Sequence, residues 1–114
     1  MEILKWLDNS KIVAEYSVVE FKIFSKGFYI KINVQLIDSS ELFIREYSDE
    51  KERNYSYHWQ NKEKKLILRW DNSPYHPERI TAPHHKHTPT GIEPTKETTL
   101  KEIIEVVANR LNQK

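Results

Sequence analysis

Apolar and polar residues alternate along residues 12–70, and this period of two is typical of β-strands with one buried face. The clearest run is FYIKINVQL, residues 28–36, in which the even positions are apolar. The preceding run, IVAEYSVVEFKIF, is rich in β-branched and aromatic residues and ends before Ser25-Lys26-Gly27. Because glycine favours a tight turn, the two runs predict a β-hairpin.

The same alternation predicts three further strands. They are LFIR at residues 42–45, NYSYHWQ at residues 54–60 and KLILRW at residues 65–70. In the second of these the large aromatic side chains share one face, and Ser56, His58 and Gln60 share the other. Five strands joined by short turns predict an antiparallel meander over about residues 12–71.

The remainder of the chain predicts a loop followed by a helix. Prolines at positions 74, 77, 83, 89 and 94 oppose helices and central strands, so residues 72–97 are expected to form an irregular loop. Residues 98–112 carry an apolar stripe at helical spacing, with Thr98 or Thr99 as the cap and Glu102 three residues after Thr99. The predicted class is α+β, with the C-terminal helix packed on one face of the sheet. Residues 1–10 fit either a short helix or an edge strand.

Composition narrows the classes of function. A chain of 114 residues is a single domain. Its 18 basic and 17 acidic residues give a net charge of +1, which excludes a strongly basic nucleic-acid coat and restricts any contact with nucleic acid to a local patch. The absence of cysteine excludes disulfides, thiolate metal sites and a cysteine nucleophile. With no signal-peptide pattern or membrane-length apolar run, a cytoplasmic protein without membrane contact is expected.

Most of the candidate chemistry lies in RWDNSPYHPERITAPHHKH, residues 69–87, which holds four of the five histidines. Strand alternation puts Arg69 and Asp71 on one side, where Arg69 can bind an anion and Asp71 can orient a histidine. A salt bridge between them, followed by an Asx turn at Asn72, explains the same residues without any function. His58 and Gln60 would neighbour Arg69 and Asp71 in the simplest hairpin register.

The histidines allow three interpretations. His85 and His87 could act as general base and general acid of a ribonuclease, with Arg69 and Lys86 stabilising the phosphate and with no metal or other cofactor. Alternatively, His85 and His87 could bind one metal ion, with Asp71 or His76 as a third ligand. They could also be exposed residues of a surface loop.

YSYHWQ, LILRWDNSPYHPE and PHHKH together resemble the conserved blocks of the TumE-like family of small prokaryotic toxins from type II toxin–antitoxin systems. The resemblance runs from about Gly27 to the C-terminal helix. It implies an antitoxin partner, usually a helix-turn-helix protein, and a target in translation or RNA. The matching positions are Tyr57, Arg69, Asp71, Asn72, His85 and His87. The chain departs from the family in the loop after Asn72, which reads SPYHPER where many members carry a glycine.

The resulting hypothesis is a toxin that acts as a metal-independent endoribonuclease. Its expected catalytic residues are Arg69, Asp71, His85 and His87, and its expected substrate-binding residues are Tyr57, His58, Asn72, His76 and Lys86. The alternative is a module without enzymatic activity, or one that binds metal, which docks a protein partner through the histidine-rich loop and the C-terminal helix. The sequence leaves open whether the chain is an enzyme and whether it forms a homo-oligomer.

Overall fold

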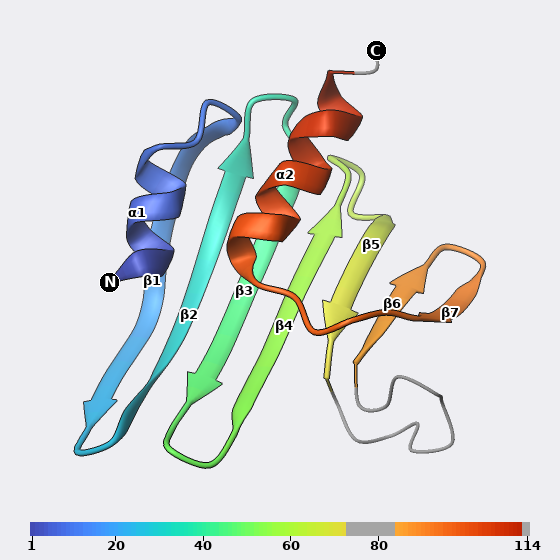
Figure 1. Ribbon diagram of the computed structural model, residues 1–114. Helices are drawn as coiled ribbons and strands as arrows, with labels where there is room; N and C mark the ends of the chain where they lie inside the picture. The colour runs from blue at the N-terminus through green and yellow to red at the C-terminus, as the bar shows by residue number, and fades with distance from the viewer. Residues whose placement is uncertain (73–83, 113–114) are drawn as a thin grey trace.

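A single antiparallel sheet, in which spatial order equals chain order, forms the body of the molecule (Figure 1). The computed structural model describes residues 1–72 and 84–112. In these residues the sheet has seven strands. They are β1 (Val13–Phe24), β2 (Gly27–Leu36), β3 (Glu41–Ser48), β4 (Arg53–Gln60), β5 (Leu66–Asp71), β6 (His85–Thr88) and β7 (Gly91–Pro94). The predicted α+β class and antiparallel meander are confirmed.

The strand count was predicted as five, and the described residues contain two more. β6 and β7 lie in the segment expected to be an irregular loop because of its prolines. Two prolines of this described segment avoid the positions where they would break a ladder: Pro89 lies in the turn between the strands, and Pro94 ends the edge strand β7. An edge strand tolerates proline because its outer backbone groups need no partner in the sheet.

The predicted first hairpin is present, and its turn brings Gly27 very close to β3. Phe24 pairs with Gly27 across a two-residue turn, and the neighbouring Phe28 pairs with Ser48. A Cβ atom placed on Gly27 would meet the Ser48 carbonyl oxygen and the Cα atom of Asp49. Only glycine fits this approach of one backbone to another.

Two helices cover the same face of the sheet (Figure 1). Residues 1–10, which fitted either a helix or a strand, contain the helix α1 (Glu2–Asp8). The predicted C-terminal helix is α2 (Leu100–Leu111), and its cap is Thr99, whose hydroxyl accepts a hydrogen bond from the Glu102 backbone N–H. Within the described residues, neither helix has the length and apolar content needed to cross a membrane.

The core lies between this face and the helices. Alternate residues of β2 to β5 point into it, and α2 contributes an apolar stripe that is at most 1% exposed. These buried side chains include Ile30, Ile32, Val34, Leu42, Ile44, Tyr55, Tyr57, Trp59, Leu68 and Trp70 from the sheet and Leu100, Ile103 and Val107 from α2.

The opposite face of the sheet, called the open face below, is covered by neither helix (Figure 1). Two rows of paired residues cross it from β2 to β6. One row runs Lys31, Arg45, Ser56, Asp71, His85, and the other runs Asn33, Phe43, His58, Arg69, His87. The polar residues predicted from sequence alternation therefore gather on one surface.

Candidate functional site

Asp71 is the centre of a compact polar cluster at the end of β5. Its carboxylate lies 2.7 Å from His85 Nε2 and 3.2 Å from His87 Nε2, and it accepts a hydrogen bond of 3.1 Å from Arg69 Nε. The Asp71 side chain is only 7% exposed, so these three groups replace water around a nearly buried charge. The cluster thus joins an anion to three potential cations at one end of the open face.

The pairing of β6 with β5 explains why the histidines reach Asp71. Asp71 pairs with His85 and Arg69 pairs with His87, so all four side chains project from the same side of the sheet. The two imidazole rings meet edge to face, with their centroids 4.8 Å apart. The spacing of two residues in His85-Lys86-His87 gives this common direction once the segment is extended.

Access to the open face differs between the two histidines. The side chain of His85 is 2% exposed, whereas that of His87 is 27% exposed. Burial lowers the pKa of His87 below its usual value, and the neighbouring His85 and Arg69 lower it further, while Asp71 raises it. Because its side chain is partly exposed, His87 is accessible to a bound molecule, whereas the buried His85 mainly holds Asp71 in place.

His58 lies on the other side of Arg69 from His87. The pairing places His58 opposite Arg69 on β4, and Arg69 Nη1 is 3.4 Å from His58 Nδ1. His58 Nε2 lies 3.2 Å from the side-chain oxygen of Gln60. Burial lowers the pKa of His58, and the nearby Arg69 charge adds to this effect. Two imidazoles thus flank one guanidinium group along a single row.

The register predicted for this hairpin was half right. His58 does neighbour Arg69, but the residue opposite Asp71 is Ser56. A shift of register between Trp59 and Gln60 places Gln60 opposite Leu66 instead. Gln60 was therefore wrongly expected beside Asp71: in an antiparallel pair that sets His58 opposite Arg69, two residues forward on β5 correspond to two residues back on β4, which is Ser56.

Three residues expected to bind substrate either project from the other face or have their side-chain groups engaged within the protein. Tyr57 is fully buried beneath the helices. Lys86 pairs with Trp70, so it projects from the face opposite His85 and His87. Asn72 is occupied in the sheet, where its side chain accepts from the Tyr55 N–H at 2.9 Å and donates to the Arg53 carbonyl oxygen at 2.6 Å.

His76, which was also expected to bind substrate and was one candidate third metal ligand, lies outside the described residues.

Comparison with known proteins adds the evidence for identity. The family model described as Toxin TumE matches residues 3–113, nearly the whole chain. The chain belongs to this family. It is thus a toxin of a toxin–antitoxin system, with a cognate antitoxin as partner. The resemblance seen in the sequence is confirmed. No curated protein and no solved structure matches the toxin in the same comparison.

On the helix-covered face, the toxin carries an ion pair that the sequence analysis missed. Glu46 is 5% exposed, and its carboxylate accepts from Arg53 Nε at 2.6 Å. The Tyr57 hydroxyl donates to the same carboxylate at 3.3 Å and accepts from Arg53 Nη2 at 2.8 Å. The sequence did contain a signal: Glu46 continues the buried alternation of Leu42 and Ile44, and a buried carboxylate requires a partner.

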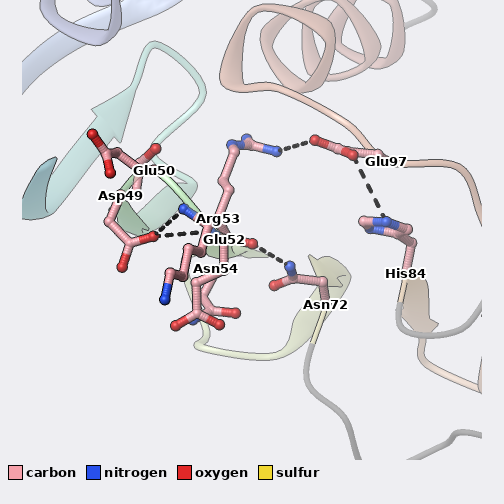
Figure 2. Close-up of a pocket in the computed structure, with 10 residues that line it drawn as sticks. Asp49, Glu50, Glu52, Arg53, Asn54, Asn72, His84 and Glu97 are labelled. Carbon is pink, nitrogen blue, oxygen red and sulfur yellow. Dashed lines mark hydrogen bonds and ion pairs between the residues drawn. The ribbon is translucent and has the colours of Figure 1, made fainter. Parts of the chain in front are cut away.

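Arg53 also contributes to a hollow of about 620 Å³ (Figure 2). Figure 2 shows Glu97 between two basic groups, with Arg53 Nη1 at 3.2 Å and His84 Nε2 at 3.8 Å from its carboxylate oxygens. Asp49, Glu50 and Glu52 also line the hollow. So many carboxylates make this surface unfavourable for the phosphates of a nucleic acid.

His84 has a structural role that follows from its contacts. Its ring stacks on Tyr55 with centroids 5.9 Å apart, and its Nδ1 lies 2.8 Å from the Tyr55 hydroxyl. Burial raises the pKa of Tyr55 to about 12, which keeps that hydroxyl protonated. These contacts fix the start of β6 against β4, and so help to place His85 and His87.

Asp71, His85 and His87 also have the geometry of a three-ligand metal site. One ligand atom from each residue lies within 4.8 Å of the other two. To bind a metal ion, both Nε2 atoms would have to be deprotonated, and the ion would sit beside the Arg69 guanidinium that bonds to the same carboxylate. The positive charge of Arg69 weighs against a divalent cation here.

Proposed function

We propose that the toxin is an endoribonuclease that needs no metal ion. The observation that carries this proposal is the row His58, Arg69, His87 on the open face, with Asp71 bonded to both Arg69 and His87. A guanidinium group can bind the charged oxygens of an RNA phosphate. The two imidazoles beside it can then remove the proton of the ribose 2′-hydroxyl and protonate the 5′-oxygen of the next nucleotide.

The proposed reaction is transfer of the phosphoryl group within RNA. One imidazole accepts the proton of the ribose 2′-hydroxyl as its oxygen attacks phosphorus. The bond from phosphorus to the 5′-oxygen of the next nucleotide breaks, and the other imidazole protonates that oxygen. The products are a 2′,3′-cyclic phosphate and a free 5′-hydroxyl. Arg69 stabilises the extra negative charge of the pentacoordinate transition state.

Each residue of the cluster has a distinct part in this proposal. His87 and His58 are the two proton-transfer groups, because both lie on the open face beside Arg69. The lowered pKa favours the neutral form that the general base needs, whereas the general acid must bind a proton before it acts. Asp71 orients His87 and fixes which of its nitrogens carries the proton. His85, although expected to be catalytic, is assigned to positioning Asp71 because it is nearly inaccessible.

The proposal is tested by incubating purified toxin with single-stranded RNA in the presence of EDTA. Cleavage that leaves 2′,3′-cyclic phosphate ends is expected. His87→Gln and His58→Gln should each slow cleavage by about 10²- to 10⁴-fold, the usual contribution of a general acid or base. The control is Lys101→Gln, which removes an exposed charge from α2 on the helix-covered side and should cleave RNA at close to the wild-type rate. Intact RNA with the unmodified toxin would refute the proposal.

The same assay addresses metal-assisted hydrolysis, the second candidate, which the convergence of Asp71, His85 and His87 favours. If cleavage is absent in EDTA and returns with a divalent transition metal, these three residues hold the ion, which would activate water as the nucleophile. A product without a cyclic phosphate would support that conclusion. The metal-free mechanism would then be wrong.

The proposal also includes a helix-turn-helix antitoxin, as expected from the sequence resemblance. The alternative of a purely docking module loses one of its surfaces, because the apolar stripe of α2 is buried against the sheet. Co-expression of the toxin with the product of the neighbouring reading frame tests this part. Rescue of growth by a small helix-turn-helix protein is expected, and rescue only by a protein of another fold would contradict it.

A further inference from the structure

Lys31 and Arg45 form a pair of cations on the open face. They lie directly opposite each other on β2 and β3. Among the residues that the structure describes, no carboxylate lies within ion-pair distance of either side chain. Glu20, which faces Lys31 from β1, is bonded to Lys22 Nζ at 2.9 Å instead. Like charges placed opposite each other destabilise a sheet, so the arrangement of Lys31 and Arg45 is costly unless an anion joins them.

A small hollow provides the space for such an anion. It has a volume of about 120 Å³, and its lining includes Lys31, Arg45 and Arg69. Ser56 and His58 add polar groups to the same wall. Three cationic side chains around a hollow of this size suit a single phosphate group, since Lys and Arg both bind phosphate oxygens.

The position of the hollow relates it to the proposed site. Arg45 and Asp71 are two strands apart in the same row, and a spacing of about 4.8 Å between strands puts their backbones about 10 Å apart. Arg69 contributes both to the hollow and to the cluster around Asp71. An anion held here would therefore be a neighbour of the group at His87 rather than the same group.

A second hollow beside the first has a different character. It measures about 410 Å³, extends to Arg69 and Asp71, and includes Tyr29 and Tyr47, which pair across β2 and β3. Glu52 also lines it, which disfavours a phosphate. The aromatic rings in its wall suit a nucleobase, because every base can stack on an aromatic side chain.

We infer that the open face binds a single-stranded RNA segment beside the cleaved bond, with Lys31 and Arg45 holding an uncleaved phosphate next to the one at Arg69. An adjacent base lies against Tyr29 and Tyr47. This inference takes RNA as the substrate from the proposed function. It adds the path of the RNA, which runs from His87 across β5, β4 and β3 to β2. It explains why a chain with a net charge of only +1 can bind nucleic acid locally.

The test uses a single-stranded oligonucleotide with 2′-O-methyl riboses, which has no 2′-hydroxyl nucleophile and cannot be cleaved. Its affinity for the toxin is measured by fluorescence anisotropy at several salt concentrations. The variant is Lys31→Gln with Arg45→Gln. The matched control is Lys5→Gln with Lys101→Gln, which makes the same change in net charge at exposed positions on the two helices.

The Lys31→Gln, Arg45→Gln variant should bind about tenfold more weakly than the control, the loss typical of a charged hydrogen-bonding group. The slope of log affinity against log salt concentration should also be less steep by roughly 0.7, the contribution of one phosphate contact in a single strand. Because the substitution removes a repulsive pair, the variant should unfold at the same urea concentration as wild type or a higher one. With that urea midpoint measured, weaker binding by the variant is a loss of contacts to RNA and not a result of unfolding.

The outcomes separate this inference from the catalytic proposal. Equal affinity of variant and control, or no binding by the wild-type toxin, would overturn the inference even if RNA is cleaved in EDTA. Weaker binding by the variant would support it even if the wild-type toxin leaves RNA intact, and only the catalytic proposal would then fail. With cleavable RNA, the variant should show a raised KM and a nearly unchanged kcat, because the lost contact is to an unreacting phosphate.

Discussion

The substitution Asp71→Asn keeps the size of the side chain but removes its charge and one acceptor oxygen. In the folded toxin the carboxylate interacts with His85, His87 and Arg69 at 2.7, 3.2 and 3.1 Å. Water can replace the lost contacts at His87 and Arg69, whose side chains are 27% and 39% exposed, but not at the buried His85. If the remaining amide oxygen serves His85, folding loses about 1–2 kcal/mol, the worth of one weakened charge-assisted hydrogen bond.

The expected effect on catalysis is larger than the effect on folding. An asparagine NH₂ group donates to His87 Nε2, so the imidazole proton moves to Nδ1 and the tautomer is reversed. The nitrogen that is free to meet the substrate, Nδ1, then carries a proton and cannot accept one. Because general acid or base catalysis contributes about 10²- to 10⁴-fold, RNA cleavage should fall by at least 100-fold at a temperature where the variant is fully folded.

Glu46→Gln is the matched control for this experiment. Glu46 is as buried as Asp71 and also bonds to an arginine, but it lies on the helix-covered face. Its replacement should lower the free energy of unfolding by about 1–3 kcal/mol and leave the cleavage rate within about threefold of wild type. Urea unfolding supplies the folded fraction, and the initial rate of RNA cleavage is divided by it. If the two variants then show equal rates per folded molecule, Asp71 has only a structural role and the assigned chemistry is wrong.

Three further results are expected. Arg53→Met leaves the buried Glu46 carboxylate without its cation and should cost about 3 kcal/mol in urea unfolding, with a loss under 1 kcal/mol contradicting the buried ion pair. His58 and His87 have folded-state pKa values below the ordinary 6.5, so the unfolded chain binds more protons as pH falls; their contribution to stability is complete above about pH 6.5 and is lost below it, and a urea midpoint that did not fall between pH 7.5 and 5.5 would oppose this. Thr99→Ala removes the cap of α2 and should lower stability by about 1 kcal/mol, measured by thermal unfolding, while an unchanged midpoint would show that the cap contributes nothing.

Most of the sheet could be predicted from the sequence because its strands have one buried face. The alternation in residues 28–36 and 54–60 identifies both the strands and the faces they present, and it put His58 with Arg69 on the open face. The same principle could not detect β6 and β7. These two short strands bury few side chains, so they show no clear alternation of apolar and polar residues, and the neighbouring prolines favoured a loop.

The candidate site was predictable in its composition but not in its geometry. Arg69, Asp71 and the histidines were identified by residue type, and the spacing of two between His85 and His87 gave their common direction. The difference in exposure between those histidines could not be foreseen, since it depends on the tertiary contacts of β6. Lys86 was misplaced for a related reason: in a loop it could turn toward the site, whereas in a strand it must point away.

The order of elements along the chain has a consequence for synthesis on the ribosome. In a meander each strand pairs with the strand made just before it, so β1 to β6 can pair as they emerge. The helix α2 follows all of them, and its buried Leu100, Ile103 and Val107 cover the apolar face of the sheet. A ribosome that has already made Asp71 and His87 has not yet made the helix that seals the core. Toxicity should therefore begin only when residues 100–111 have been added, although none of the proposed catalytic side chains lies among them.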